Sequence, residues 1–392
     1  MILMTIKMIT TVMLLLLCVT IYSNTIAIKP SNYYETDSGS IENPYLISNL
    51  ANLRWLSETK SVWGNENKKF YFKQTAEIDA TETRIWNEGR GFSQIGDSDQ
   101  LIFNQEGYLE SSSDFLGNYD GGNYIIKNIF ISNNGTDYRF IGFFGSIRDS
   151  EIKNLRLENV QYIVENSVVG ALCNNALNSR IINSSVTGSI IVNDLPQKSY
   201  LVPDSPVDWG PSTLSGFVSS VHFSTIDNCF SEVNIINVVN HNNSVSGFAN
   251  QLHSTTISNS YYHGAIINQK SDSAGLVRNL GNSKIKNSYA IVSTNKSLYG
   301  LIYSPLDSSV VNSYFLRNDK VKKGLPNLFE LRFFKPFFKN YFLKKYSGKG
   351  LSERNMWKIR SFKGWDFSNI WRIDPNINSG FPHLILGINN SH

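Results

Sequence analysis

The sequence predicts an all-β fold, a right-handed parallel β-helix built from stacked coils. The first observation is a pattern that recurs six times between Ile141 and Leu316, in which a glycine in an apolar setting is followed by an Ile-x-Asn or Val-x-Asn triplet. The second is that glycine and asparagine are 12 residues apart in every copy but one, where the count is 13, while successive glycines are 25 to 46 residues apart. Repeats of about 20 to 50 residues are typical of solenoids. The constant inner spacing therefore indicates a fixed turn of chain, joined to the next by connections of variable length.

The triplets predict strands of a few residues, because Ser, Asn, Asp and Gly interrupt the segments around them. Residues two apart on a strand face the same side, so we expect each asparagine to point inward beside the preceding Ile or Val. Buried amides need partners, which stacked asparagines can supply as a ladder. Parallel crossovers favour the right hand; a β-sandwich is the alternative, but it gives no reason for a fixed count. The expected ladder is Asn128, Asn154, Asn183, Asn228, Asn259, Asn287 and Asn312, and the structural glycines are Gly142, Gly170, Gly216, Gly247, Gly275 and Gly300.

The chain has 392 residues and a formal net charge of +4. This charge is too small to indicate a nucleic-acid partner. We expect a signal peptide at residues 1–27, because Lys7 precedes an apolar run from Ile9 to Ile21 and small residues follow it. A retained anchor is the alternative, but the run is short for a spanning helix, so we expect no transmembrane span after cleavage.

The region before the coils, residues 28–114, does not repeat and is predicted to be an N-terminal cap, because the first coil of a solenoid exposes a strand edge. Within it, Leu50–Leu56 is spaced like a short amphipathic helix, and Phe70–Asp79 alternates like a strand. The predicted coil domain, residues 115–316, opens with a tight-turn signal at Asp120–Asn123.

Residues 317–392 are predicted to form a C-terminal basic and aromatic cap. The stretch 317–349 contains ten Lys or Arg residues against two acidic ones, with aromatic residues between them. Basic residues among aromatics can bind an anionic polymer or a membrane surface. The alternative is that the aromatics close the last coil while the lysines face water.

Cys173 and Cys229, which remain after signal cleavage, occupy different positions of the coil. We therefore expect buried thiols rather than a disulfide. Neither has a neighbour at metal-ligand spacing, and we expect neither a metal nor a cofactor.

The entry stretch Phe115–Asn128, followed by Ile141–Gly145, resembles the bacterial GLUG-motif proteins and the β-helical N-terminal region of the M26-type IgA-protease family. The start at Pro44–Ile47 and the finish at Trp371–Asp374 and Asn378–Leu384 are similar. The resemblance implies an exported or surface-displayed β-helix and supplies no active site to transfer. The related proteases use a His-Glu-x-x-His zinc motif, which this sequence lacks, so zinc proteolysis is not expected.

The long gap in the repeat is an insertion at about Asn193–Thr213. Loops on a rigid scaffold often carry recognition, and Tyr200 and Trp209 are our candidate ligand-binding residues, with a packed cover over the coil as the alternative. The sequence offers no catalytic cluster. The acidic entry (Asp97, Asp99, Glu106, Glu110, Asp114 and Asp120) is a candidate calcium or sugar site, but it lacks the D-x-D-x-D-G spacing of a calcium loop, and an ordinary solvated loop is the favoured alternative.

We therefore expect a secreted or cell-surface, non-enzymatic, adhesin-like module whose partner is a host or matrix glycan or protein. The alternative is a carbohydrate-active enzyme, a polysaccharide lyase or glycosidase, on the same fold.

Overall fold

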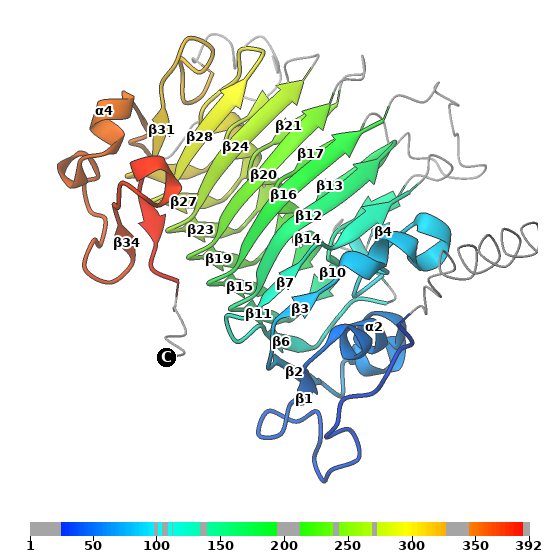
Figure 1. Ribbon diagram of the computed structural model, residues 1–392. Helices are drawn as coiled ribbons and strands as arrows, with labels where there is room; N and C mark the ends of the chain where they lie inside the picture. Colours follow the sequence, from blue (N-terminus) through cyan, green and yellow to red (C-terminus); the bar gives the residue numbers. More distant parts are fainter. Residues whose placement is uncertain are drawn as a thin grey trace, which may run out of the picture.

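The described strands of the computed structural model form a parallel β-helix, in which the chain passes through four sheets in turn and then rises to the next coil (Figure 1). The structure describes residues 25–97, 101–103, 109–111, 113–133, 139–193, 212–237, 243–268, 273–326 and 345–386. The signal peptide predicted at 1–27 lies almost wholly outside this set. The fold class expected from the repeat is confirmed.

Sheets I and II form the first half of each coil. Sheet I contains β9 (Arg139–Ile141), β13 (Ser167–Gly170), β17 (Thr213–Ser215), β21 (Ser244–Ser246) and β25 (Ser273–Ala274). Sheet II contains β10 (Phe144–Arg148), β14 (Cys173–Leu177), β18 (Val218–His222), β22 (Ala249–His253), β26 (Val277–Gly281) and β29 (Ile302–Leu306).

Sheets III and IV form the second half. Sheet III contains β1 (Tyr45–Ile47), β2 (Tyr71–Gln74), β6 (Asn118–Asp120), β11 (Glu151–Lys153), β15 (Arg180–Ile182), β19 (Thr225–Asp227), β23 (Thr256–Ser258), β27 (Lys284–Lys286), β30 (Ser309–Val311) and β32 (Lys345–Tyr346). Sheet IV contains β3 (Ile78–Asp79), β7 (Ile125–Lys127), β8 (Phe130–Ser132), β12 (Arg156–Val164), β16 (Ser185–Val192), β20 (Phe230–Asn237), β24 (Tyr261–Asn268), β28 (Tyr289–Thr294), β31 (Tyr314–Leu316) and β33 (Lys349–Leu351).

The remaining elements lie outside these sheets. They are the helices α2 (Leu50–Glu58) and α4 (Glu353–Met356), the 3-10 turns η1 (Lys60–Val62), η2 (Thr81–Gly89), η3 (Ile359–Ser361) and η4 (Asn378–Gly380), and two antiparallel pairs, β4 (Leu101–Phe103) with β5 (Leu109–Ser111) and β34 (Trp371–Arg372) with β35 (His383–Leu384). The predicted helix at Leu50–Leu56 is thus confirmed as part of α2, capped by the Asn49 side chain, which accepts from the Asn52 N–H.

The fixed Gly-to-Asn spacing has a structural cause. Each glycine lies at the junction of sheets I and II, and each asparagine follows the strand of sheet III. A Cβ on Gly247 would lie 2.2 Å from the carbonyl oxygen of Gly275 in the next coil, so the junction leaves no room for a side chain. The copy with one extra residue has it at this junction, where Ala171 and Leu172 separate β13 from β14.

The prediction of an inward asparagine ladder is wrong. The asparagines after the strands of sheet III are corner residues with left-handed backbones, φ between 46° and 54°, and most are half-buried rather than internal. Asparagine tolerates this region better than most residues, which explains its recurrence. Some of their side chains do bond along the axis, as Asn183 Nδ2 does to Asn154 Oδ1 at 3.3 Å. Asn128 belongs to another column, because it accepts from Asn159.

The internal polar ladder is made by the residue after each asparagine. Ser260 Oγ accepts from the Cys229 N–H of the preceding coil at 3.2 Å. It donates to the carbonyl of Ser258, in its own coil, at 2.7 Å. The same arrangement links Ser260 to Ser288 and Ser288 to Ser313. A second ladder follows the corner between sheets II and III, through Ser150, Ser179, Ser224, Thr255, Ser283 and Ser308. These hydroxyls satisfy backbone donors that the bent chain cannot pair within its sheets.

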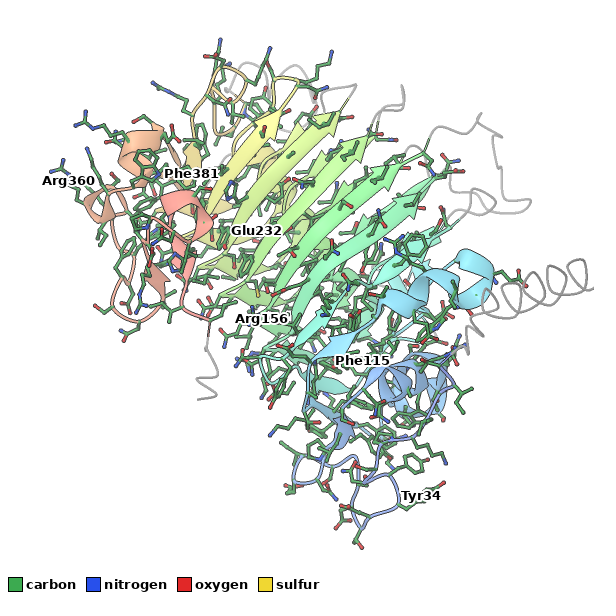
Figure 2. The ribbon with its side chains drawn as sticks, in the orientation of Figure 1. Tyr34, Phe115, Arg156, Glu232, Arg360 and Phe381 are labelled. Atoms are coloured by element: carbon green, nitrogen blue, oxygen red, sulfur yellow. The ribbon has the colours of Figure 1, made fainter. Side chains whose placement is uncertain are left out.

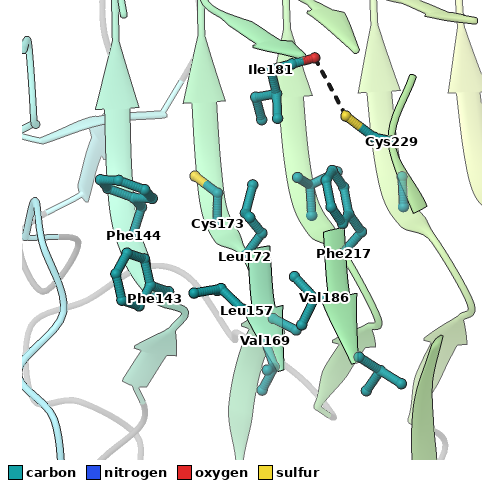
Figure 3. Close-up of a cluster of buried hydrophobic side chains, with 14 of the residues drawn as sticks. Phe143, Phe144, Leu157, Val169, Leu172, Cys173, Ile181, Val186, Phe217 and Cys229 are labelled. Atoms are coloured by element: carbon teal, nitrogen blue, oxygen red, sulfur yellow. Dashed lines mark hydrogen bonds between the residues drawn. The ribbon is translucent and has the colours of Figure 1, made fainter. Parts of the chain in front are cut away.

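The core lies inside the coils and is apolar along its length (Figure 3). Phe217 stacks on Phe248 of the next coil with ring centroids 4.7 Å apart. Cys173 and Cys229 are buried free thiols, as predicted, and burial raises the pKa of both. Cys229 Sγ donates to the Ile181 carbonyl, the bond drawn in Figure 3.

Both predicted caps contain strands of the coils. β1, β2 and β3 extend sheets III and IV into residues 28–114, so the expected single strand at Phe70–Asp79 is two strands on two sheets. At the other end, β32 and β33 extend the same sheets. The segment after β33 then packs its aromatics, including Trp365 and Trp371, against Tyr261, Tyr289 and Tyr314 of sheet IV. Most of the basic and aromatic stretch, residues 327–344, lies outside the described set.

Candidate binding cleft and polar clusters

A cleft of about 380 Å³ lies beside the first coils. Its walls come from the end of α2 with η1, from the loop after η2, and from β8 and β9 of the coils. This volume falls within the range of small-molecule sites, about 300 to 1,000 Å³. The cleft therefore joins segments of the non-repeating region to the regular scaffold.

The end of η2 and the loop after it are held in shape by their own residues. Asn87 and Glu88 have left-handed backbones, with φ of 52° and 58°. The Asn87 amide donates to the Gly91 carbonyl at 2.7 Å and to Ser93 Oγ at 3.0 Å. Gly91 approaches β8 so closely that a Cβ would lie 2.1 Å from the Phe130 carbonyl oxygen. This wall of the cleft is consequently tied to sheet IV.

The cleft combines charged groups with buried aromatic rings. Lys60 Nζ lies 2.5 Å from Asp97 Oδ2, and the exposed Arg90 donates from Nε to the Asn87 carbonyl at 3.1 Å. Phe92 is buried and stacks on Phe143 with ring planes 4° apart. Charged donors and acceptors over a rigid apolar floor can fix the orientation of a polar ligand.

The acidic entry predicted as a calcium or sugar site does not converge on one point. Asp97 lines the cleft, while Asp114 accepts from Arg148 Nε at 2.9 Å and Asp120 accepts from Asn154 Nδ2 at 2.9 Å. Asp99, Glu106 and the side chain of Glu110 lie outside the described residues. Within the part of the chain that the structure describes, no three His, Cys, Asp or Glu side chains are grouped as metal ligands.

A second polar cluster lies on the outer face of sheet IV, where Figure 2 labels Glu232. The Tyr261 hydroxyl donates to Glu232 Oε1 at 3.0 Å, and His263 Nδ1 lies 2.5 Å from Asn378 Oδ1 of the C-terminal segment. Burial raises the pKa of Glu232, and the Tyr261 hydrogen bond and the nearby His263 oppose that rise. A carboxyl with a raised pKa is typical of a general acid, but these contacts include one carboxylate where glycoside hydrolysis uses two.

The predicted ligand-binding residues Tyr200 and Trp209 lie outside the described residues, in the gap between β16 and β17. The connections between sheet IV and sheet I vary most in length. The insertion joins β16 to β17 at this corner, where shorter connections join β20 to β21 and β24 to β25. Of the cleft residues, sequence reasoning identified Asp97 alone as a candidate site residue, because the others, except Ile141 of the first repeat, belong to segments without a motif.

Comparison with solved structures supports the architecture. The crystal structure of a "putative immunoglobulin A1 protease" from Bacteroides ovatus superposes with a TM-score of 0.60 at 18% identity, covering 89% of this chain and 94% of that one. At this identity the likeness concerns the fold alone.

The helices among the described residues are too short to span a bilayer.

Two curated proteins are similar to part of the sequence. Halomucin of Haloquadratum walsbyi is 26% identical over 154 residues, 39% of this chain. A "Putative Gly-rich membrane protein" of Evansella cellulosilytica is 30% identical over 148 residues, 37% of this chain. The matched region spans 2% of the first relative and 15% of the second. No protein-family model matches the sequence.

Proposed function

We propose that this protein is an exported, surface-displayed β-helix that binds a host or matrix glycan without cleaving it. The observation that carries the proposal is the cleft, whose lining combines the charged Lys60, Arg90 and Asp97 with the aromatic Trp63 and Phe92. Export is supported by the signal-like N-terminus and by the GLUG-type resemblance. The names of the two partial relatives, Halomucin and a "Putative Gly-rich membrane protein", agree with a place at the cell surface.

The test is a screen of the chain without residues 1–27 against a printed oligosaccharide array and immobilised matrix proteins. We expect binding to a restricted set of glycans. Arg90→Ala removes an exposed donor from the lining of the cleft and should weaken this binding about tenfold to a hundredfold, since hydrogen bonds to charged groups contribute about 1.5 to 3 kcal/mol. Arg360→Ala, at the C-terminal end of the molecule in Figure 2, is the matched control and should bind like the wild type.

A further variant replaces residues 194–211 with a short Gly-Ser linker, to measure the contribution of Tyr200 and Trp209. Binding to a protein alone would keep the adhesin-like role and exclude a glycan ligand. Absence of binding to every glycan would overturn the proposed glycan ligand, and absence of binding to every protein as well would overturn the adhesin-like role.

The second candidate is a glycan-cleaving enzyme, and the raised pKa of Glu232 beside Tyr261 and His263 is the observation in its favour. Reducing-end release and absorbance of unsaturated products, measured over the same oligosaccharides, test it. Turnover that Glu232→Gln abolishes would establish this candidate in place of binding.

A further inference from the structure

One corner of the coil has a residue type that rarely adopts the backbone conformation found there. The six residues that turn the chain from sheet II to sheet III all have left-handed φ, between 44° and 52°, and five of them are Asp149, Asn178, Ser254, Asn282 and Asp307. These have short polar side chains, of which asparagine and aspartate tolerate the left-handed region best. The sixth is Phe223, with φ of 50°. A bulky aromatic residue in this conformation is a true outlier, and such outliers concentrate at functional sites.

The Phe223 ring also interrupts a side-chain ladder. Elsewhere in this column the corner residues bond along the axis, as Asn282 Nδ2 does to Ser254 Oγ at 3.2 Å and as Asn178 does to Asp149. The Phe223 ring instead contacts His253 edge-on, with centroids 5.9 Å apart, and remains 41% exposed. An asparagine here would suit the backbone and extend the ladder, so stability does not account for the phenylalanine.

A shallow hollow of about 340 Å³ follows Phe223 along the same corner. Its wall includes Ser254, the corner residue of the next coil, and Asn282 and Asp307 of the two coils after that. Lys284 of β27 adds a cation, and Asn282, Lys284 and Asp307 are all exposed. The hollow is thus lined by an amide, a carboxylate and an ammonium group, and Phe223 lies one coil before its first wall residue, Ser254.

The neighbouring face of sheet II continues this pattern. Ser220, Gln251, Asn279 and Ser304 are in register on successive strands and form a row of hydroxyl and amide groups. Ser220 Oγ lies 2.9 Å from His222 Nε2. The row therefore lies on the same face of sheet II as His222 and its strand neighbour His253. Successive groups are about 4.8 Å apart, the spacing of strands in a sheet.

We propose that Phe223 and the adjoining corner hollow form a saccharide-binding subsite, in which one pyranose ring stacks on Phe223 and the hydroxyls of the next sugar units of the same glycan bond to Asn282, Lys284 and Asp307. An aromatic ring beside amide and carboxylate groups suits a ligand with apolar C–H faces and many hydroxyls. The row on sheet II then accommodates further sugar units along the axis. This inference rests on the proposed glycan-binding function and assigns it a site separate from the cleft.

The experiment compares Phe223→Asn and Phe223→Trp with the wild type, in the full chain without residues 1–27, on the same printed oligosaccharide array and by thermal unfolding. Phe223→Asn should raise the melting temperature by a few degrees, because asparagine accepts the left-handed backbone, and should weaken glycan binding about two- to tenfold, the loss expected for an aromatic stack. Phe223→Trp should bind glycan like the wild type and should melt at the wild-type temperature, below that of Phe223→Asn. Asp307→Asn should weaken binding through the hydroxyl contacts.

A more stable protein that binds less cannot owe its loss of binding to unfolding, so this pair of results would establish the subsite. Glycan binding that Phe223→Asn leaves unchanged while Arg90→Ala reduces it would overturn the subsite and leave the proposed function standing. Absence of glycan binding by the wild type would overturn both.

Discussion

Replacing Asn259 separates the two roles that we assign to the corner asparagines. Asn259 is 8% exposed and has a φ of 46°. Its Nδ2 donates to Asp227 Oδ1 at 3.0 Å, and its Oδ1 accepts from Asn287 Nδ2 at 3.4 Å. Asn259→Gly keeps the backbone and loses the two bonds, which we expect to cost about 1 to 2 kcal/mol. Asn259→Ala loses the same bonds and also bears the left-handed penalty of about 1 to 2 kcal/mol.

The glycine variant has a smaller cost of its own, because glycine raises the entropy of the unfolded chain and so lowers stability by about 0.4 to 1 kcal/mol relative to alanine. We therefore expect the alanine variant to be less stable than the glycine variant by about 1 kcal/mol. Urea unfolding followed by far-ultraviolet circular dichroism measures the difference as a shift in midpoint. An alanine variant at least as stable as the glycine variant would refute the corner assignment, since that order fits an asparagine on an extended strand.

Three further changes probe other parts of the coil. Gly247→Ala should lower stability by about 1 to 3 kcal/mol through overpacking, while Gly281→Ala, whose new Cβ would meet nothing closer than 3.4 Å, should change the urea midpoint little. Ser260→Ala should cost about 1 to 2 kcal/mol, because the Cys229 N–H loses its acceptor, and slower unfolding than the wild type would contradict the serine ladder. Burial lowers the pKa of His222 to about 4, so the unfolded chain binds more protons between about pH 4 and 6.5. Stability should fall by about 2 to 3 kcal/mol across that window as pH falls, and His222→Gln should show a correspondingly smaller fall.

Most of the coil architecture could be predicted from the repeat. Glycine at the junction of sheets I and II and asparagine after sheet III recur because close approach and a left-handed turn allow few other residues. The inward orientation was mispredicted because Ile-x-Asn fits two conformations, an extended strand and a strand that ends in a left-handed corner. The serines after the asparagines were visible in the sequence, but their role as backbone acceptors depends on the bend.

Other features depend on contacts that no local pattern encodes. β1 and β2 lack the glycine and asparagine of later coils, so their membership of sheet III follows only from the pairing of β1 with β2 and of β2 with β6. The cleft brings Lys60 and Asp97 together from segments without a repeat. Phe223 is different, because aligning the six corner positions would have revealed one aromatic residue among Asp, Asn and Ser.

The central claim is that this β-helix binds a saccharide and leaves it intact. The most direct measurement is isothermal titration of the chain without residues 1–27 with its best array glycan, followed by mass spectrometry of the recovered glycan after prolonged incubation with stoichiometric protein. We expect saturable binding, weakened by Phe223→Asn, and a glycan of unchanged mass. Recovery of shortened or unsaturated products would contradict the claim and would identify the protein as a carbohydrate-active enzyme.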